Sequence, residues 1–82
     1  MKYTVIWVPS ARARLAELYI QASDKRALSA AANRIDRELQ RDAGAKGAPW
    51  GRFRVYSDDP LAVLFEVDPG DRMVRVFLVR RN

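Results

Sequence analysis

The first apolar segment of the chain alternates along residues 2–8, where β-branched and aromatic side chains dominate. A period of two predicts a β-strand, and apolar residues on both sides of it predict that both faces are substantially covered. Pro9 ends this strand, because proline cannot donate a backbone hydrogen bond within a sheet.

Two segments with helical spacing follow. Ser10 is the expected N-cap of a first helix that reaches about Gln21, and Ser23 or Asp24 is the expected cap of a second helix over residues 25–43. The short break between them predicts an antiparallel helical hairpin. The expected buried stripes are Leu15, Leu18 and Tyr19, then Leu28, Ala31, Ala32, Ile35 and Leu39. Arg26, Arg34, Arg37 and Arg41 should project outward, with Arg34 placed to pair with Glu38 four residues later.

The second half of the chain changes to the period of strands. Residues 44–51 contain three glycines and predict a flexible stretch, after which residues 52–56, 61–67 and 73–79 predict three strands. Pro69 and Gly70 occupy the two central positions expected for a type II turn between the last two strands. These strands form an antiparallel meander, and the helical hairpin must cover one of its faces.

Together these elements predict one α+β domain over residues 1–82, in the order β-α-α-β-β-β, with a helical hairpin packed on an antiparallel sheet. The length of 82 residues is enough for one domain and too short for two. The N-terminal apolar segment is too short for a signal sequence or a membrane span, so we expect a cytoplasmic protein without a membrane partner.

The composition excludes several kinds of chemistry. The chain has no cysteine and no histidine, which excludes disulfides, thiolate metal sites and imidazole acid–base catalysis. Asp68 and Asp71 are explained by turn chemistry, and Glu66 is placed to pair with an arginine on a neighbouring strand. We therefore expect neither a metal ion nor another cofactor.

The charge is strongly basic, with 15 lysines and arginines against 10 acidic residues. A formal charge of +5 favours an anionic partner, either nucleic acid or an acidic protein segment, although it also serves plain solubility. Trp50 could stack on a base, but a tryptophan in a loop more often covers the edge of the core, which is the expectation here. Tyr3 and Tyr19 are expected in the core, which leaves Tyr56 as the hydroxyl nearest the arginine-rich strand.

The order of elements and several segments resemble the RelE/ParE superfamily, the small basic toxins of bacterial type II toxin–antitoxin pairs. The likeness begins with residues 3–7 and Pro9, continues through residues 11–18 and 32–39, and is strongest at Leu-Ala-Val-Leu-Phe-Glu-Val-Asp (residues 61–68) and at residues 72–79. The first of these last two segments resembles the R-V-I-Y-E-V-D strand of the family. The likeness spans essentially the whole chain as a pattern of apolar residues, without an invariant catalytic signature.

The resemblance implies two alternative activities. RelE-like members cleave messenger RNA on the ribosome without a metal, whereas ParE-like members are not enzymes and inhibit DNA gyrase; an antitoxin that wraps around the toxin neutralises either kind. Arg52 and Arg54 match the paired basic positions of the RelE-like strand, where they would stabilise charge on a phosphate. Arg80 or Arg81 could stand in for the arginine of the C-terminal tail, and Arg81 is the catalytic candidate of the two. The candidate nucleic-acid contacts are Lys46, Arg52, Arg54, Arg75 and Arg80.

Two departures from the RelE-like pattern favour binding over catalysis. Ala62 stands where an arginine is often found, and the chain ends at Arg80-Arg81-Asn82, short of the usual tyrosine-containing tail. The leading hypothesis is a toxin with a cognate antitoxin partner and metal-independent mRNA endonuclease activity. The alternatives are a ParE-like gyrase inhibitor and a catalytically degenerate member that only binds a partner protein. A general nucleic-acid-binding module is a third reading.

Overall fold

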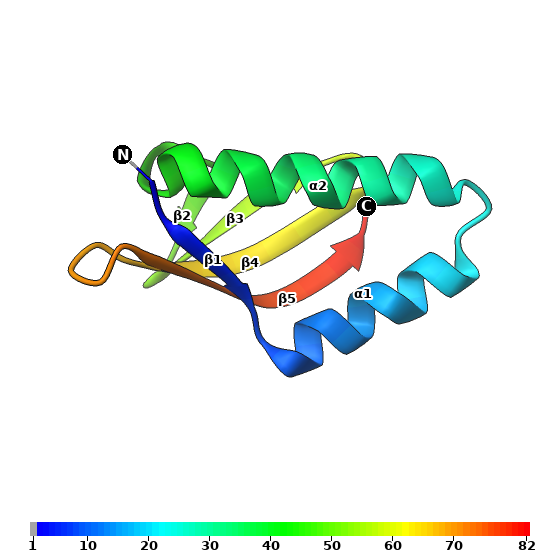
Figure 1. Cartoon of the computed structure of the whole chain (residues 1–82), viewed down its shortest axis with the longest axis horizontal. Helices are drawn as coiled ribbons and strands as arrows, with labels where there is room; N and C mark the ends of the chain where they lie inside the picture. The colour runs from blue at the N-terminus through cyan, green and yellow to red at the C-terminus, as the bar shows by residue number, and fades with distance from the viewer. Residues whose placement is uncertain (1) are drawn as a thin grey trace.

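Two helices cover one face of a five-stranded sheet in the computed structural model, which describes residues 2–82 (Figure 1). The first residue of the predicted domain lies outside this range. In chain order the elements are β1 (Thr4–Trp7), α1 (Pro9–Gln21), α2 (Lys25–Asp42), a 3-10 turn η1 (Ala43–Ala45), β2 (Ala48–Trp50), β3 (Phe53–Asp58), β4 (Leu61–Asp68) and β5 (Met73–Arg81). The predicted α+β class, helical hairpin and closing meander are confirmed.

The sheet has the strand order β1-β5-β4-β3-β2. The strand β1 runs parallel to β5, whereas the other neighbours are antiparallel, so the sheet is mixed rather than wholly antiparallel. The short strand β2 is an addition to the predicted order, because the expected flexible stretch at residues 44–51 forms η1 and then pairs with β3. Arg52 was expected on a strand but lies in the turn before β3.

The core lies between the helices and the covered face of β4 and β5. Its largest fully buried side chains are Phe65, Leu28, Ile35, Leu39, Leu61, Val63, Val74 and Val76. The spacing of Leu28, Ile35 and Leu39 places them on one stripe of α2, which is why this helix lies across the sheet. At roughly 2–3 kcal/mol for each large apolar side chain removed from water, this contact is the main source of stability.

The ends of the helices differ in how well the sequence predicts them. The side chain of Asp24 caps α2, with Oδ1 accepting a hydrogen bond from the Ala27 amide at 3.0 Å, as expected. Helix α1 instead begins at Pro9, with Val8 in the N-cap position and no side-chain cap, so the prediction of Ser10 as N-cap is wrong. Proline is well suited to the first helical position, since it has no amide hydrogen to leave unpaired.

Three further local predictions are wrong. Thr4 and Ile6 are exposed, so only one face of β1 is covered. Glu38 forms ion pairs with Arg41 and Lys46 instead of Arg34, whose partner is Asp58. The turn after β4 is not of type II, because the residue with a positive φ angle there is Arg72 rather than Gly70.

An irregularity in the pairing of β4 with β5 shapes the uncovered face of the sheet. Leu64 lies opposite Leu78 and Phe65 opposite Val76, so Phe77 is an extra residue without a partner across the strand. Its ring meets that of Phe53 at 5.6 Å between centroids in an edge-to-face contact. A bulge of this kind turns two consecutive side chains, here Phe77 and Leu78, toward the same side of the sheet.

Candidate functional site

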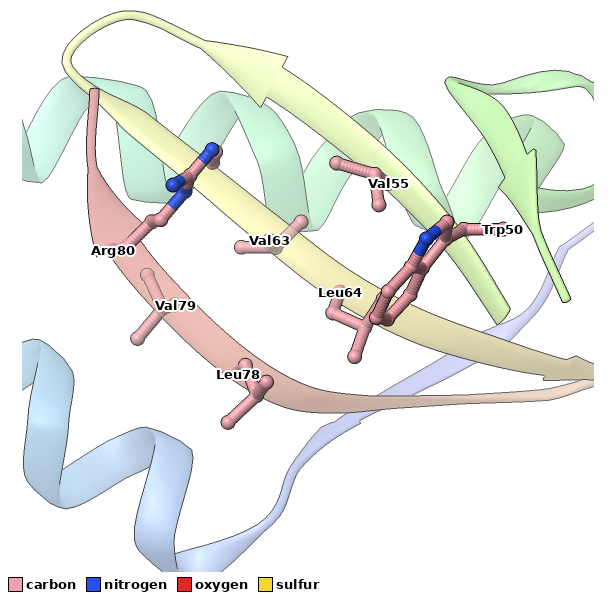
Figure 2. Close-up of a pocket in the computed structure, with 8 residues that line it drawn as sticks. Trp50, Val55, Val63, Leu64, Leu78, Val79 and Arg80 are labelled. Atoms are coloured by element: carbon pink, nitrogen blue, oxygen red, sulfur yellow. The ribbon is translucent and has the colours of Figure 1, made fainter. Parts of the chain in front are cut away.

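The face of the sheet that the helices leave uncovered, called the open face from here on, carries an apolar groove. The groove has a volume of about 410 Å³ and is lined by Trp50, Val55, Ala62, Val63, Leu64, Leu78, Val79 and Arg80. Figure 2 shows the Trp50 indole at one end of this set, beside Leu64, and the Arg80 guanidinium at the other end, over β4. The walls are therefore one aromatic and one cationic side chain around an aliphatic floor.

The strand register explains why these residues meet. Val55 pairs with Leu64, and Leu64 pairs with Leu78, so the three side chains form one row across β3, β4 and β5. Trp50 belongs to the short strand β2 and lies opposite Phe53 of β3. Trp50 is 64% exposed and Leu78 61% exposed, so the expectation that Trp50 covers the edge of the core is wrong.

Arg54 is held on the other face of the sheet by the loop before β2. Its Nε donates to the Lys46 carbonyl oxygen at 2.8 Å and its Nη2 to the Gly47 carbonyl oxygen at 3.1 Å. The strand partner of Arg54 is Phe65, which is fully buried in the core beneath the helices. These hydrogen bonds give the guanidinium a structural role, because they fix the loop that leads into β2.

Arg52 lies on the open face, where its Nε is 3.5 Å from Oε2 of Glu66 and its guanidinium lies 5.1 Å from the centroid of the Phe53 ring. The predicted pairing of Glu66 with an arginine is thus confirmed. Arg75 lies opposite Glu66 on β5, which places it on the same face. The side chains of Arg52 and Arg54 consequently have partners on opposite faces and do not form a parallel clamp, although both residues border one depression at the end of the sheet.

The C-terminal arginines are also divided between the two faces. Arg80 pairs with Ala62 and borders the open-face groove, whereas Arg81 lies near the start of α2 in a depression with Asp24 and Pro60. Counted along the strands and across the sheet, Arg81 lies roughly 15–20 Å from Arg54. The three catalytic candidates Arg52, Arg54 and Arg81 are therefore not brought together.

Lys46, the remaining nucleic-acid candidate, is engaged near the end of α2. Its Nζ lies 3.1 Å from Oε1 of Glu38, whose second oxygen lies 3.2 Å from Nη1 of Arg41. The hydrogen bond from Lys46 lowers the pKa of the Glu38 carboxyl, and the same bond raises the pKa of Lys46. Lys46 therefore belongs to the helix side of the molecule, away from the open face.

Tyr56 also faces the helices. Its strand partner Val63 is a core residue, and its side chain borders a depression with Arg37 and the ion pair of Arg34 with Asp58. The Arg34 guanidinium makes two hydrogen bonds of 2.9 Å to the Asp58 carboxylate and thereby lowers the pKa of that carboxyl. The Tyr56 hydroxyl is thus on the wrong side of the sheet to act with Arg52.

A second apolar surface, the hairpin groove, lies between α1 and α2. Its volume is about 450 Å³, and it is lined by Arg12, Leu15, Ala16, Tyr19, Ile20, Leu28, Ser29, Ala32 and Asn33. Tyr19 is 42% exposed here, so its predicted burial in the core is wrong, and Ile20 is 73% exposed. The Nζ of Lys25 closes one end of the hairpin, 3.0 Å from the carbonyl oxygens of Ile20 and Ala22.

Two further observations limit the chemistry within residues 2–82. No group of three or more acidic side chains in this range is arranged to hold a metal ion. No helix in the same range is long and apolar enough to cross a bilayer.

Sequence reasoning missed both apolar surfaces. Ile20 lies outside the buried stripe of its helix, and a large apolar residue at a position that the period assigns to solvent is a signal for such a surface. Leu78 gave no such signal, because the alternation of Val74 and Val76 assigns it to the covered face and only the bulge turns it to the open face.

The fold is similar to that of two solved toxin–antitoxin structures. One is a chain of the RelBE2 toxin–antitoxin complex of Mycobacterium tuberculosis, with a TM-score of 0.83 and 21% identity over 100% of both chains. The other belongs to the chromosomal ParDE TA system of P. aeruginosa, with a TM-score of 0.70 and 19% identity over 98% of this chain and 96% of that chain. No family model and no curated protein sequence matches. The resemblance seen in the sequence thus holds at the level of architecture, because this chain shares its fold with a chain of each of these two toxin–antitoxin structures.

Proposed function

We propose that this protein is the toxin of a type II toxin–antitoxin pair and that it acts by binding a partner protein rather than by cutting messenger RNA. The likeness over the whole chain to structures of toxin–antitoxin systems supports the first part. The internal contacts of Arg52 and Arg54 support the second part, and they are the observation that carries the proposal. Arg54 is bonded to two loop carbonyl groups, and Arg52 is paired with Glu66 on the opposite face.

Metal-independent cleavage of RNA needs cationic groups and an acid–base group that converge on one phosphate. Arg54 would have to give up two hydrogen bonds to reach a phosphate, and Arg81 and Tyr56 face the helix side. The open face offers instead an apolar groove with an exposed tryptophan, which is the composition of a protein interface.

The hairpin groove fits an antitoxin segment. Exposed apolar side chains at Tyr19 and Ile20 line a channel between two helices, which suits the apolar stripe of an amphipathic helix. Arg12 at the border of the groove provides a positive charge for an acidic residue of that helix. A short neighbouring gene should therefore encode an acidic or amphipathic protein that co-purifies with this one.

One observation favours the RelE-like endonuclease as a second candidate. Arg75 and Arg80 lie on the open face, and neither forms an ion pair within residues 2–82. Because the chain has a formal charge of +5, this face would attract the RNA backbone.

The binding form of the proposal has two versions, a ParE-like gyrase inhibitor and a member that binds another protein.

Induced expression in a bacterial host separates these candidates. The proposal predicts growth arrest, relief of the arrest by the product of the neighbouring gene, and no new transcript ends in primer extension. Purified protein should then be tested in a gyrase supercoiling assay, where inhibition identifies the ParE-like version. Transcript cleavage on ribosomes would establish the endonuclease in place of binding, and an absence of growth arrest would remove the toxin reading altogether.

A further inference from the structure

We infer that the open-face groove binds an acidic protein segment that inserts a bulky apolar side chain between Trp50, Leu64 and Leu78 and places carboxylates against Arg80. The inference rests on the proposed function only in taking the partner to be a protein. It names the recognition chemistry of a surface distinct from the hairpin groove, which lies between α1 and α2.

The distribution of exposed apolar side chains points to this surface. Five large apolar residues within residues 2–82 are exposed, namely Ile6, Tyr19, Ile20, Trp50 and Leu78. Tyr19 and Ile20 belong to the hairpin groove, and the other three lie on the open face, because Ile6 pairs with Arg75 in the sheet. Scattered apolar residues such as Ile6 need no explanation, but Tyr19 with Ile20 and Trp50 with Leu78 each line a groove, which indicates two interaction sites.

The charge around the groove indicates an acidic occupant. Arg80 borders the groove, and neither it nor Arg75 has a carboxylate within 4.0 Å among the described residues. The carboxylate of Glu66 on this face is already paired with Arg52. A partner that brings its own carboxylates would satisfy these guanidinium groups in a bidentate manner, which arginine suits better than lysine.

Other occupants fit less well. A second copy of the chain, docked face to face, would add a second set of unpaired guanidinium groups to the interface, whereas the Glu66 carboxylate of each face is already paired with Arg52. RNA would meet a floor of Val55, Leu64 and Leu78, which provides no hydrogen-bonding side chain for bases. A single tryptophan offers one stacking surface, whereas single-stranded nucleic acid is normally held by several.

The groove is also held in shape before binding. Trp50 lies on β2. The loop before β2 is fixed by the two hydrogen bonds that Arg54 donates to the Lys46 and Gly47 carbonyl oxygens. Gly47 has a φ angle of 69° and lies against the Val55 backbone, so the loop approaches β3 closely. A preformed aromatic wall reduces the ordering cost of binding and marks Trp50 as the anchor residue.

The test uses purified full-length protein and a phage-displayed library of random short peptides. Peptides selected on the wild type should combine Asp or Glu with Leu, Phe or Trp, and synthetic versions should bind in fluorescence polarisation. Trp50→Ser, Leu78→Ser and Arg80→Glu should each weaken that binding by roughly tenfold or more, as expected for central interface residues. Trp50→Phe should retain most of the binding. Arg14→Glu, a matched charge reversal on the exposed side of α1, should leave it unchanged. Thermal melts confirm that each variant is folded.

Four results would overturn the inference. Selected peptides without an acidic bias would show that the groove does not select carboxylates. Peptides that bind the Trp50→Ser and Arg80→Glu variants as well as the wild type would show that the groove is not their site. Tighter binding of a single-stranded oligouridylate, lost in Trp50→Ser, would assign the face to RNA. Concentration-dependent dimerisation lost in Trp50→Ser would assign it to a second copy. Growth arrest is measured without peptides, so a failure of the proposed function is distinguished from a failure of this inference.

Discussion

Gly47 is the backbone position on which the presentation of Trp50 depends most directly. It has a φ angle of 69°, and a Cβ atom placed there would lie 2.1 Å from the Val55 carbonyl oxygen and 2.8 Å from its carbon. Both contacts are with backbone of the adjacent strand β3, so no side-chain rotation can relieve them. The replacement Gly47→Ala should therefore separate β2 from β3 in addition to straining its own backbone.

The magnitude can be worked from these two effects. A left-handed conformation costs a non-glycine residue about 1–2 kcal/mol. Separating the strands removes backbone hydrogen bonds worth about 1 kcal/mol each, and three residue pairs join β2 to β3. If about two of these hydrogen bonds are lost, the expected loss is about 3–4 kcal/mol. A domain of 82 residues has a free energy of unfolding of roughly 4–12 kcal/mol, so the loss is a large share of it.

The chain supplies two matched controls for this experiment. Gly51 has a φ angle of 62° but open space where a Cβ atom would lie, so Gly51→Ala should cost only the conformational term of about 1–2 kcal/mol. Gly44 has neither a positive φ angle nor a close neighbour, so Gly44→Ala should be neutral or slightly stabilising. Urea unfolding followed by circular dichroism gives the three free energies of unfolding.

The melting temperature should fall by about 4–8 °C for each kcal/mol in a domain of this size, which makes the predicted order easy to resolve. The expected order of stability is Gly44→Ala, then Gly51→Ala, then Gly47→Ala. Equal losses for Gly47→Ala and Gly51→Ala would refute the reasoning, because the backbone contact with Val55 would then contribute nothing.

Four other predictions concern the remaining contacts. Arg54→Gln should lower the free energy of unfolding by about 1–3 kcal/mol in urea melts, because two charged hydrogen bonds to the loop are lost; a neutral result would mean that the loop does not need them. Asp24→Ala should cost about 0.5–2 kcal/mol through the lost cap of α2, and Asp24→Ser should restore most of it. Ile35→Ala should cost about 2–5 kcal/mol, since the side chain is fully buried, and a loss below about 1 kcal/mol, as at an exposed site, would contradict its place in the core. The pKa of Asp58 is lowered by Arg34, so the stability from this pair is present above the unfolded pKa of about 4 and is lost as the pH falls through the folded pKa. Melts from pH 7 down to pH 2 should show Asp58→Asn with a shallower loss than the wild type.

The sequence predicted the elements with a strong period and missed those that depend on distant contacts. The stripe of Leu28, Ile35 and Leu39 is visible without a structure, since a buried helix face repeats every three to four residues. The strand β2 was missed because it has three residues, including Pro49, and its pairing with β3 is fixed by Gly47 and Arg54 rather than by its own propensity. The parallel pairing of β1 with β5 joins the two ends of the chain, and no local signal reports it.

The candidate site was predicted less well than the fold. Arg52 and Arg54 are two residues apart, which on a regular strand would place them on one face, but Arg52 lies in the turn before β3 and the two side chains have partners on opposite faces. The exposure of Trp50 depends on the position of β2 at the edge of the sheet, which the sequence does not encode locally. The predictions for Arg52 and Trp50 thus failed because Arg52 lies in a turn and Trp50 lies on an edge strand.

The central claim is that this protein acts through the apolar groove of the open face and not through Arg52 and Arg54. Growth arrest on induced expression, compared between the Trp50→Ser and Arg52→Gln variants at equal protein level, tests it most directly. Both side chains are largely exposed, so both variants should fold. The account predicts that Trp50→Ser loses the arrest and Arg52→Gln keeps it. Arrest that persists in Trp50→Ser and disappears in Arg52→Gln would contradict it.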